Sequence, residues 1–289
     1  MPESLRIGRI SYLNLYPIFH GLDKVAPGRY NYMDGHPARV NALLRRGAVD
    51  LSPSSSIVYL RQPLDFSLIE GHSVSSDGPV RSIYLFSRFP IEELGGRTIG
   101  ATNQTETSAA LLKIILAKFY GLPLALRATG LPAARALARF GAWLSIGDDA
   151  MRAYKIFNSK NSGLPFRGSG GEAPTNKKGG WVGKSLFIYD LGGIWREKTG
   201  LPFVFALWVA RKEAVREKRR AFSSFKDDLA LARDYALSHL RQAARTQPVA
   251  ELDQAEVIRY WKGISYGLGP DEKKGLQLFR KYAREFGLL

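Results

Sequence analysis

Few side chains of this 289-residue chain are suited to metal or thiol chemistry. The chain contains no cysteine, which excludes disulfides, thiolate nucleophiles and zinc–cysteine sites. Its four histidines are His20, His36, His72 and His239, and no two of them have the i, i+4 spacing of a metal-binding helix. The sequence therefore predicts no metal site and no cofactor, which leaves hydroxyl and amide side chains as the candidates for binding and catalysis.

Hydroxyl and amide side chains gather directly after the first predicted strand. The strand-like run Arg6–Ser11 is followed by Tyr12 and Asn14 and then by a helix that opens with Pro17. Polar groups at the carboxyl end of a strand in an α/β fold are well placed for ligand recognition. We therefore take Ser11, Tyr12 and Asn14 as candidate binding residues.

Serine residues stand beside two later strand-like runs. The segment Ser52–Ser56 follows one of them and contributes Ser54 and Ser55 as candidates. A turn or capping role is the commoner explanation for such a serine cluster. Ser82 stands at the start of the strand-like run Ile83–Phe86 and is a further candidate.

The segment Thr105-Glu106-Thr107-Ser108 opens an apolar helix. Its hydroxyls can cap that helix, and the backbone N–H groups of the first turn can receive an anion. Capping is favoured by roughly two to one over ligand binding, because hydroxyl caps are far commoner than carboxylate sites. We keep Thr105, Thr107 and Ser108 as candidates for binding a carboxylate, since a helix start after a strand is where α/β folds usually bind ligands.

Two other motifs have simpler explanations. Gly183-Lys184-Ser185 fails as a phosphate-binding loop, because Lys178 stands where that motif requires a glycine and a strand-like run follows it. Asp148 and Asp149 form a carboxylate pair, but adjacent residues of an extended segment point to opposite sides. At most one of them would face a site, and a capping or turn role is the commoner explanation.

The elements that must position these residues follow an α/β pattern. Short strand-like runs alternate with helix-like stretches, a second set opens at Gly96–Thr102, and the chain turns mostly helical after Leu201–Ala210. In the last predicted helix, Gly275–Phe286, the apolar residues share one face that should pack onto a sheet. The segment Asn158–Lys184 is rich in Gly, Ser, Asn and Lys, which predicts a flexible insertion.

The formal net charge of +16, from 42 basic and 26 acidic residues, raises the chance of an anionic partner. The basic residues are spread over several segments, so an ordinary charged surface is favoured first, attraction of a small anion second and nucleic acid last. No apolar stretch is long enough to cross a bilayer, and the first residues do not read as a secretion signal. We therefore expect a cytoplasmic protein that binds neither membrane nor nucleic acid.

Motifs along nearly the whole chain carry a family resemblance. The opening is Arg6-Ile-Gly-Arg-Ile-Ser-Tyr-Leu-Asn-Leu-Tyr-Pro17. The further segments are Val40-Asn41, Gly47–Asp50, Ser54–Tyr59, Thr107–Leu112, Ile146–Ala150, Tyr189–Gly192, Thr199–Trp208, Tyr260-Trp261 and Ile264–Gly269. Together they resemble the chorismate dehydratases of the futalosine route to menaquinone, whereas the related naphthoate synthase branch opens with a different motif that contains cysteine.

The resemblance implies an α/β fold of the periplasmic-binding-protein type II kind, with two lobes and the substrate in the cleft between them. Lobe 1 would comprise residues 1–87 and 203–289, including the C-terminal helices. Lobe 2 would comprise residues 88–202 and carry the insertion at 158–184. Crossing strands are expected near Ser82–Arg88 and Pro202–Ala210.

The activity that the resemblance implies is that of a hydro-lyase without a cofactor. It would remove water from chorismate to give 3-[(1-carboxyvinyl)oxy]benzoate. Two alternatives share the fold: a non-catalytic solute-binding protein for small carboxylates, and the effector-binding part of a regulator. The absence of a recognisable signal peptide argues against the first, and the absence of a helix-turn-helix segment argues against the second.

The resemblance also suggests roles for the candidate residues. Asn14 and Ser82 would bind the reacting side of the substrate, and Asn14 would orient it, because an amide cannot act as a base near neutral pH. Thr107 and Ser108 would hold one carboxylate at the helix start. The proton would pass to the side-chain carboxylate of the substrate itself. Gly147 and Asp148 would line the site from the second lobe.

One residue departs from the family pattern. Glu106 stands where we expect a basic or neutral residue. We therefore expect no direct contact between that side chain and an anion.

Overall fold

The computed structural model describes residues 4–160 and 186–289, and the chain divides into two compact units. One unit combines the chain up to Asp77 with Gln104–Thr107 and Leu201–Leu289, and the other combines Gly78–Asn103 with Ser108–Gly200. These boundaries differ from the lobes drawn from the sequence. Residues 78–87, which we placed in the first lobe, belong to the second unit, and Gln104–Thr107 belong to the first.

The first unit is built on a six-stranded sheet of order β11-β4-β10-β3-β1-β2. Strand β1 pairs in parallel with β2 and β3, whereas β10 runs antiparallel to β3 and β4. Strand β10 is buried on both faces along most of its length, as expected for a central strand. The strands are β1 (Arg6–Ile10), β2 (Asn31–Gly35), β3 (Leu51–Ser55), β4 (Phe66–Ser76), β10 (Phe203–Arg211) and β11 (Ser265–Gly267).

Local sequence signals explain where several helices of the first unit begin. Helices α1, α2 and α12 each carry a proline in their first two positions, which suits the fixed φ of that residue. Helix α11 begins with a capping box formed by Asp253 and Glu256. The helices are α1 (Tyr16–Val25), α2 (Pro37–Arg45), α3 (Ser56–Arg61), α8 (Lys212–Glu217), α9 (Arg219–Ser238), α10 (Leu240–Arg245), α11 (Gln254–Lys262) and α12 (Pro270–Glu285).

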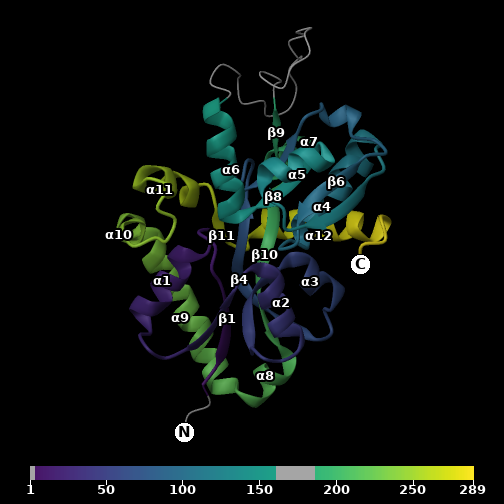
Figure 1. Ribbon diagram of the computed structural model, residues 1–289. Coiled ribbons are helices and arrows are strands. Elements are labelled where there is room, and N and C mark those ends of the chain that lie inside the picture. The colour runs from purple at the N-terminus through teal and green to yellow at the C-terminus, as the bar shows by residue number, and fades with distance from the viewer. Residues whose placement is uncertain (1–3, 161–185) are drawn as a thin grey trace. The chain divides into compact units, whose positions relative to one another are not determined.

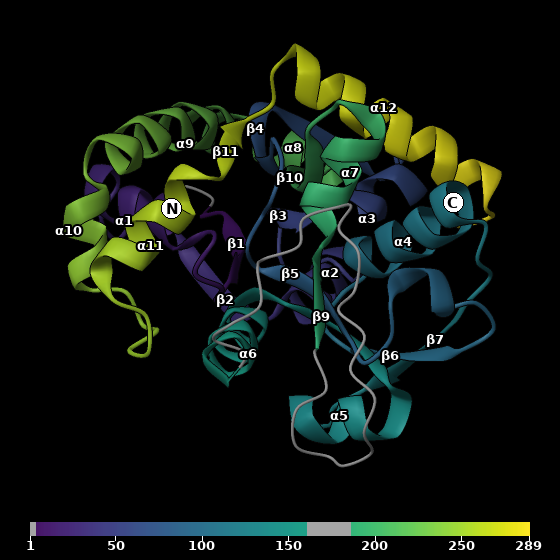
Figure 2. The same cartoon turned by 90° about the horizontal axis from the view of Figure 1, so that it is seen from above.

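Aromatic side chains join these helices to the sheet. Trp208 of β10 lies between Phe19 of α1 and Phe225 of α9, with ring centroids 5.6 and 5.7 Å away. Helices α1 and α9 lie side by side (Figures 1 and 2). The ring of Phe279 in α12 contacts Phe203 of β10, with ring centroids 4.9 Å apart, which confirms that the apolar face of the last helix packs onto the sheet.

The second unit contains a five-stranded sheet of order β7-β6-β8-β5-β9. Its core includes Tyr84 and Phe86 of β5, with Trp143 of β8 stacked on Phe86 at 5.7 Å. The elements are β5 (Ile83–Ser87), a 3₁₀ turn (Ile91–Glu93), β6 (Thr98–Thr102), α4 (Thr107–Ile114), a π-helical turn (Ile115–Phe119), β7 (Ala125–Thr129), α5 (Ala133–Phe140), β8 (Ala142–Ile146), α6 (Gly147–Lys160), β9 (Phe187–Asp190) and α7 (Leu191–Thr199).

The structure confirms most predicted elements and adds others. Strands β2 and β11 and helices α3, α6 and α7 were not predicted. The part after Leu201–Ala210 that we expected to be mostly helical contains several helices, of which α9 and α10 meet at His239. Of the predicted insertion Asn158–Lys184, the first three residues end helix α6 and the rest lies outside the described residues. In the described part of the chain, no helix is both long and apolar enough to cross a membrane.

Candidate functional site

The loop between β1 and α1 places Asn14 at the carboxyl end of a parallel strand, where the sequence predicted it. Its backbone carbonyl accepts a hydrogen bond of 2.7 Å from the hydroxyl of Tyr266. The carbonyl of Leu13 accepts one of 2.7 Å from the indole N–H of Trp261. The side-chain oxygen of Asn14 is buried and has no hydrogen-bond partner among the described residues. This acceptor is therefore available to a bound ligand.

The two other candidates of this loop differ in their surroundings. The Tyr12 hydroxyl donates a hydrogen bond to the side-chain oxygen of Gln104, which belongs to the same unit. Ser11 is exposed, and its backbone N–H donates to the carbonyl of Gly35 at 3.2 Å. Tyr12 thus connects the loop to the segment that precedes helix α4.

The serine candidates of β3 are buried, and their hydroxyls have partners within the protein. The hydroxyls of Ser52 and Ser54 lie 2.8 Å apart, so one of them donates to the other. Ser55 accepts a bond of 3.1 Å from the amide of Asn41, and its backbone N–H donates to the oxygen of that amide at 3.3 Å. The turn or capping role that the sequence favoured is wrong for Ser54 and Ser55, because both lie in β3 and the Ser55 side chain makes no capping bond at the start of α3.

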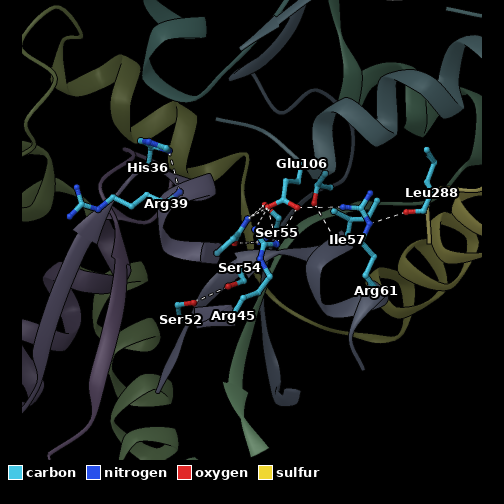
Figure 3. A network of polar contacts seen from close by, with 12 residues as sticks. His36, Arg39, Arg45, Ser52, Ser54, Ser55, Ile57, Arg61, Glu106 and Leu288 are labelled. Carbon is cyan, nitrogen blue, oxygen red and sulfur yellow. Dashed lines mark hydrogen bonds and ion pairs between the residues drawn. The ribbon is translucent and has the colours of Figure 1, made fainter. Parts of the chain in front are cut away.

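Glu106 lies at the centre of a polar network (Figure 3). Its carboxylate accepts a hydrogen bond of 2.9 Å from the Asn41 amide. It also faces Arg45 at 3.3 Å and Arg61 at 3.4 Å. The acidic residue that departs from the family pattern is thus neutralised by two guanidinium groups of its own unit, which share one carboxylate and leave an excess of positive charge.

Thr107 is anchored beside this network. Its side-chain oxygen accepts a hydrogen bond of 3.2 Å from the backbone N–H of Ile57 and lies 3.4 Å from the hydroxyl of Ser56. The Thr107 side chain is almost fully buried, whereas Thr105 is half-buried. The hydroxyl of Thr107 therefore fixes the end of the segment Gln104–Thr107 to the start of α3 within the first unit.

In the second unit, the structure brings Ser82 and Gly147 together. The Gly147 backbone N–H donates to the carbonyl of Ser82 at 2.7 Å, because β5 and β8 pair antiparallel with Ile83 opposite Ile146. Gly147 has a φ of +63° and opens helix α6, so its left-handed conformation suits a glycine. Asp148 and Asp149 lie in the first turn of α6 and not in an extended segment, which corrects the sequence prediction. Asp148 is nearly buried, while Asp149 is exposed and pairs with Arg152 of the same helix.

A buried carboxylate fixes the backbone just before Ser82. Asp190, at the start of α7, accepts hydrogen bonds from the backbone N–H of Val80 at 3.0 Å and of Arg81 at 2.7 Å. Arg81 has a φ of +60° and is the non-glycine residue with a positive φ in the described part of the chain. The backbone directly before Ser82 is therefore held by Asp190 in an unusual conformation.

The candidate residues divide between the two units, and their roles in binding stay predictions. The first unit holds Ser11, Tyr12, Asn14, Ser54, Ser55, Thr105 and Thr107, and the second holds Ser82, Ser108, Gly147 and Asp148. Within the first unit, the Tyr12–Gln104 bond ties the Asn14 loop to the segment Gln104–Thr107. No three His, Cys, Asp or Glu side chains within residues 4–160 and 186–289 are grouped as a metal site would require.

Sequence reasoning missed the residues that hold these loops in place. Arg45, Arg61, Asp190, Trp261 and Tyr266 were not among the candidates. Asp190, Trp261 and Tyr266 do stand in segments that carry the family resemblance. That is the signal that could have found them, whereas the two arginines belong to no motif.

Comparisons with known proteins give the family of this chain. The family model described as menaquinone biosynthesis matches residues 5–285. A chorismate dehydratase from Thermus thermophilus is 31% identical over 223 residues, which cover 74% of this chain and 76% of that protein. Both matches agree with the resemblance found in the sequence motifs.

Solved structures show the fold. The alkanesulfonate-binding protein of Xanthomonas axonopodis has a TM-score of 0.62 at 18% identity and covers 100% of this chain and 94% of its own. A Candida albicans protein described as having the generic periplasmic-binding-protein fold has a TM-score of 0.59 at 10% identity, with coverages of 99% and 91%. The predicted α/β fold of this type is confirmed, and the chain belongs to the menaquinone biosynthesis family.

Proposed function

We propose that this chain is a chorismate dehydratase that eliminates water from chorismate to give 3-[(1-carboxyvinyl)oxy]benzoate for menaquinone biosynthesis. The family match and the Thermus thermophilus relative support this activity. The observation that carries it at the level of the site is the buried, unpaired side-chain oxygen of Asn14, at the carboxyl end of β1. A non-catalytic carboxylate-binding role is not favoured by the family match.

The reaction requires a correctly oriented substrate more than it requires strongly acidic or basic side chains. A proton leaves the ring carbon that bears the ether, its electron pair forms the last ring double bond, and the neighbouring C–O bond breaks. The departing hydroxyl takes up the proton that the ring carbon lost, which the side-chain carboxylate of the substrate passes on, and it leaves as water; the aromatic ring that results drives the step. Orientation and modest stabilisation of the departing hydroxyl are then sufficient contributions from the protein.

The candidate residues receive roles that fit this chemistry. Asn14 would accept a hydrogen bond from the substrate hydroxyl through its free side-chain oxygen, and Ser82 would contact the reacting side. The proton would go to the side-chain carboxylate of the substrate. Gly147, which is bonded to Ser82, and Asp148 stay candidates for substrate contact in the second unit.

A substrate carboxylate would be bound at the start of helix α4. The side-chain oxygen of Thr107 already accepts a bond from Ile57, so the backbone N–H groups of the first turn and Ser108 are the proposed donors. The excess positive charge of Arg45 and Arg61 over Glu106 favours an anion in this part of the chain. The cytoplasmic location expected from the sequence stays a prediction.

The test is to incubate the purified chain with chorismate alone. We expect the absorbance of the chorismate diene to fall and an aromatic product to accumulate over many turnovers, without added metal or cofactor. The matched control is the Asn14→Ala chain at the same concentration. Stoichiometric binding of chorismate without conversion would contradict the proposal and favour a solute-binding role.

A further inference from the structure

Two buried aromatic side chains from the C-terminal part of the chain fix the backbone around Asn14. The Tyr266 hydroxyl donates to the Asn14 carbonyl, and the Trp261 indole donates to the Leu13 carbonyl, each at 2.7 Å. Their exposed fractions are 4% and 0%. Burial raises the pKa of Tyr266 well above its ordinary value, so the hydroxyl remains a donor across the usual range of pH.

Both aromatic residues belong to elements that are themselves well anchored. Tyr266 lies on β11, which pairs with β4 at the edge of the sheet, and Trp261 lies on α11, which begins with a capping box. The side-chain oxygen of Asn14 has no partner among the described residues, so no hydrogen bond to that oxygen sets its direction. A bond to the carbonyl of the same residue fixes the peptide plane next to that side chain.

We infer that Tyr266 is a positioning residue for Asn14 and acts on the reaction only through the backbone carbonyl of Asn14. This inference rests on the proposed function. Because a misplacement of about 1 Å at a reacting group can cost about a hundredfold in rate, a partial loosening of this loop should be visible in turnover.

The first experiment removes only the hydroxyl. We expect Tyr266→Phe to lower kcat for chorismate about tenfold and to change KM less than about twofold, because orientation is lost while the substrate contacts remain. Tyr16→Phe is the matched control, because Tyr16 is two residues from Asn14 in the chain. Its hydroxyl also donates to a backbone carbonyl, that of Thr246, at 2.6 Å. That control should keep the wild-type kcat.

The second experiment asks whether Tyr266 works through Asn14. In the Asn14→Ala background, Tyr266→Phe should cause no further loss of kcat, and amide hydrogen exchange of the β1–α1 loop should speed up in Tyr266→Phe but not in Tyr16→Phe. Wild-type kcat or unchanged exchange in Tyr266→Phe would overturn the inference. Wild-type kcat in Asn14→Ala would instead overturn the proposed site.

A different observation supports a second positioning residue, in the other unit. The Asp190 carboxylate is 6% exposed and binds the N–H groups of Val80 and Arg81, and Arg81 has a φ of +60°. A side chain with a Cβ rarely adopts this conformation unless its surroundings hold it there. We infer that Asp190 is a positioning residue for Ser82, by holding Arg81 in that conformation.

Glycine gives a direct test, because it adopts a positive φ without help. We expect Asp190→Asn to lower kcat for chorismate about tenfold, and Arg81→Gly to raise the kcat of that variant several-fold, although it gives no gain in the wild type. Asp190 also caps helix α7 by accepting a bond from the Gly193 N–H. Arg81→Gly cannot restore that cap, so a rescue by Arg81→Gly reports on the conformation of Arg81 alone.

The sign of the Arg81→Gly effect decides the inference on Asp190. A folded Asp190→Asn chain with wild-type kcat, or one that Arg81→Gly fails to improve, would overturn it. If Asp190→Asn does not fold, Asp190→Ser, which retains one acceptor oxygen, takes its place in the same comparison.

Discussion

At the scale of single residues, a missing hydrogen bond distinguishes Asn14 from the other polar candidates of its unit. The hydroxyls of Ser54, Ser55 and Thr107 already bond to other groups of the protein. The buried oxygen of Asn14 has no such bond in the described part of the chain. A buried acceptor without a partner costs about 1–3 kcal/mol, which a ligand that supplies the donor would recover.

The first prediction concerns the two proposed catalytic residues. Asn14→Ala and Ser82→Ala should each lower kcat for chorismate about a hundredfold while the chain stays folded, because one transition-state hydrogen bond is typically worth about 3 kcal/mol. The control for the amide is Asn31→Ala, since Asn31 is exposed and bonds to Ser4 at 3.1 Å. Steady-state kinetics and circular dichroism measure both effects, and wild-type kcat in both variants would contradict the assignment.

The second prediction concerns Glu106, whose carboxylate is shared by Arg45 and Arg61. Glu106→Gln should lower the free energy of unfolding by about 1 kcal/mol, because the two arginines and the Asn41 amide lose the charge of the half-buried carboxylate that they share. The matched control is Glu70→Gln, whose carboxylate is 66% exposed and pairs with Lys273 at 3.1 Å. That exposed pair should contribute less than about 0.5 kcal/mol. If urea unfolding shows that Glu106→Gln and Glu70→Gln lose equal free energy of unfolding, the prediction is contradicted.

At the scale of elements, strand ends could be predicted and the contacts that hold them could not. The apolar and polar patterns placed Asn14 after β1 and Thr107 at the start of α4 because these signals are local. The anchors of these loops lie far away in the chain: Tyr266 is 252 positions from Asn14, and Arg45 is 61 from Glu106. No periodicity or spacing links such pairs, so only the fold reveals them.

The third prediction concerns the packing of β4. Burial lowers the pKa of His72 to about 4, with a smaller contribution from the positive charge of Arg233, while Asp234 opposes the shift. The unfolded chain therefore binds this proton first as the pH falls. Stability from the neutral ring is fully present above about pH 6.5 and is lost as the pH falls towards 4, at about 1.4 kcal/mol per pH unit.

The measurement compares the pH dependence of urea unfolding in the wild type and His72→Gln. The wild type should lose about 3 kcal/mol more than the variant between pH 6.5 and 4, since only the wild type carries this histidine. His36→Gln is the control, because His36 instead caps helix α2 through the Arg39 N–H. Parallel curves for the wild type and His72→Gln would contradict the buried, neutral state of His72.

At the scale of the whole molecule, composition and pattern gave the α/β class, and the motif resemblance gave the family that the comparisons confirm. The unit boundaries were harder to predict because the chain passes between the units more than twice. The segment Gln104–Thr107 joins the first unit through Glu106 and Thr107, although its neighbours on both sides belong to the second. A segment this short does not differ recognisably in composition from its neighbours, so the sequence alone could not assign it to the first unit.

We expect this chain to convert chorismate by itself and to need Asn14 to do so. Proton NMR of chorismate with the wild-type chain should show that the ring signals of chorismate disappear. The signals of one aromatic product, formed from chorismate by loss of one water, should grow in equal amount. With Asn14→Ala at the same concentration, the same change should be about a hundredfold slower. Chorismate that stays unchanged with a folded wild-type chain, or equal conversion by both chains, would contradict the account.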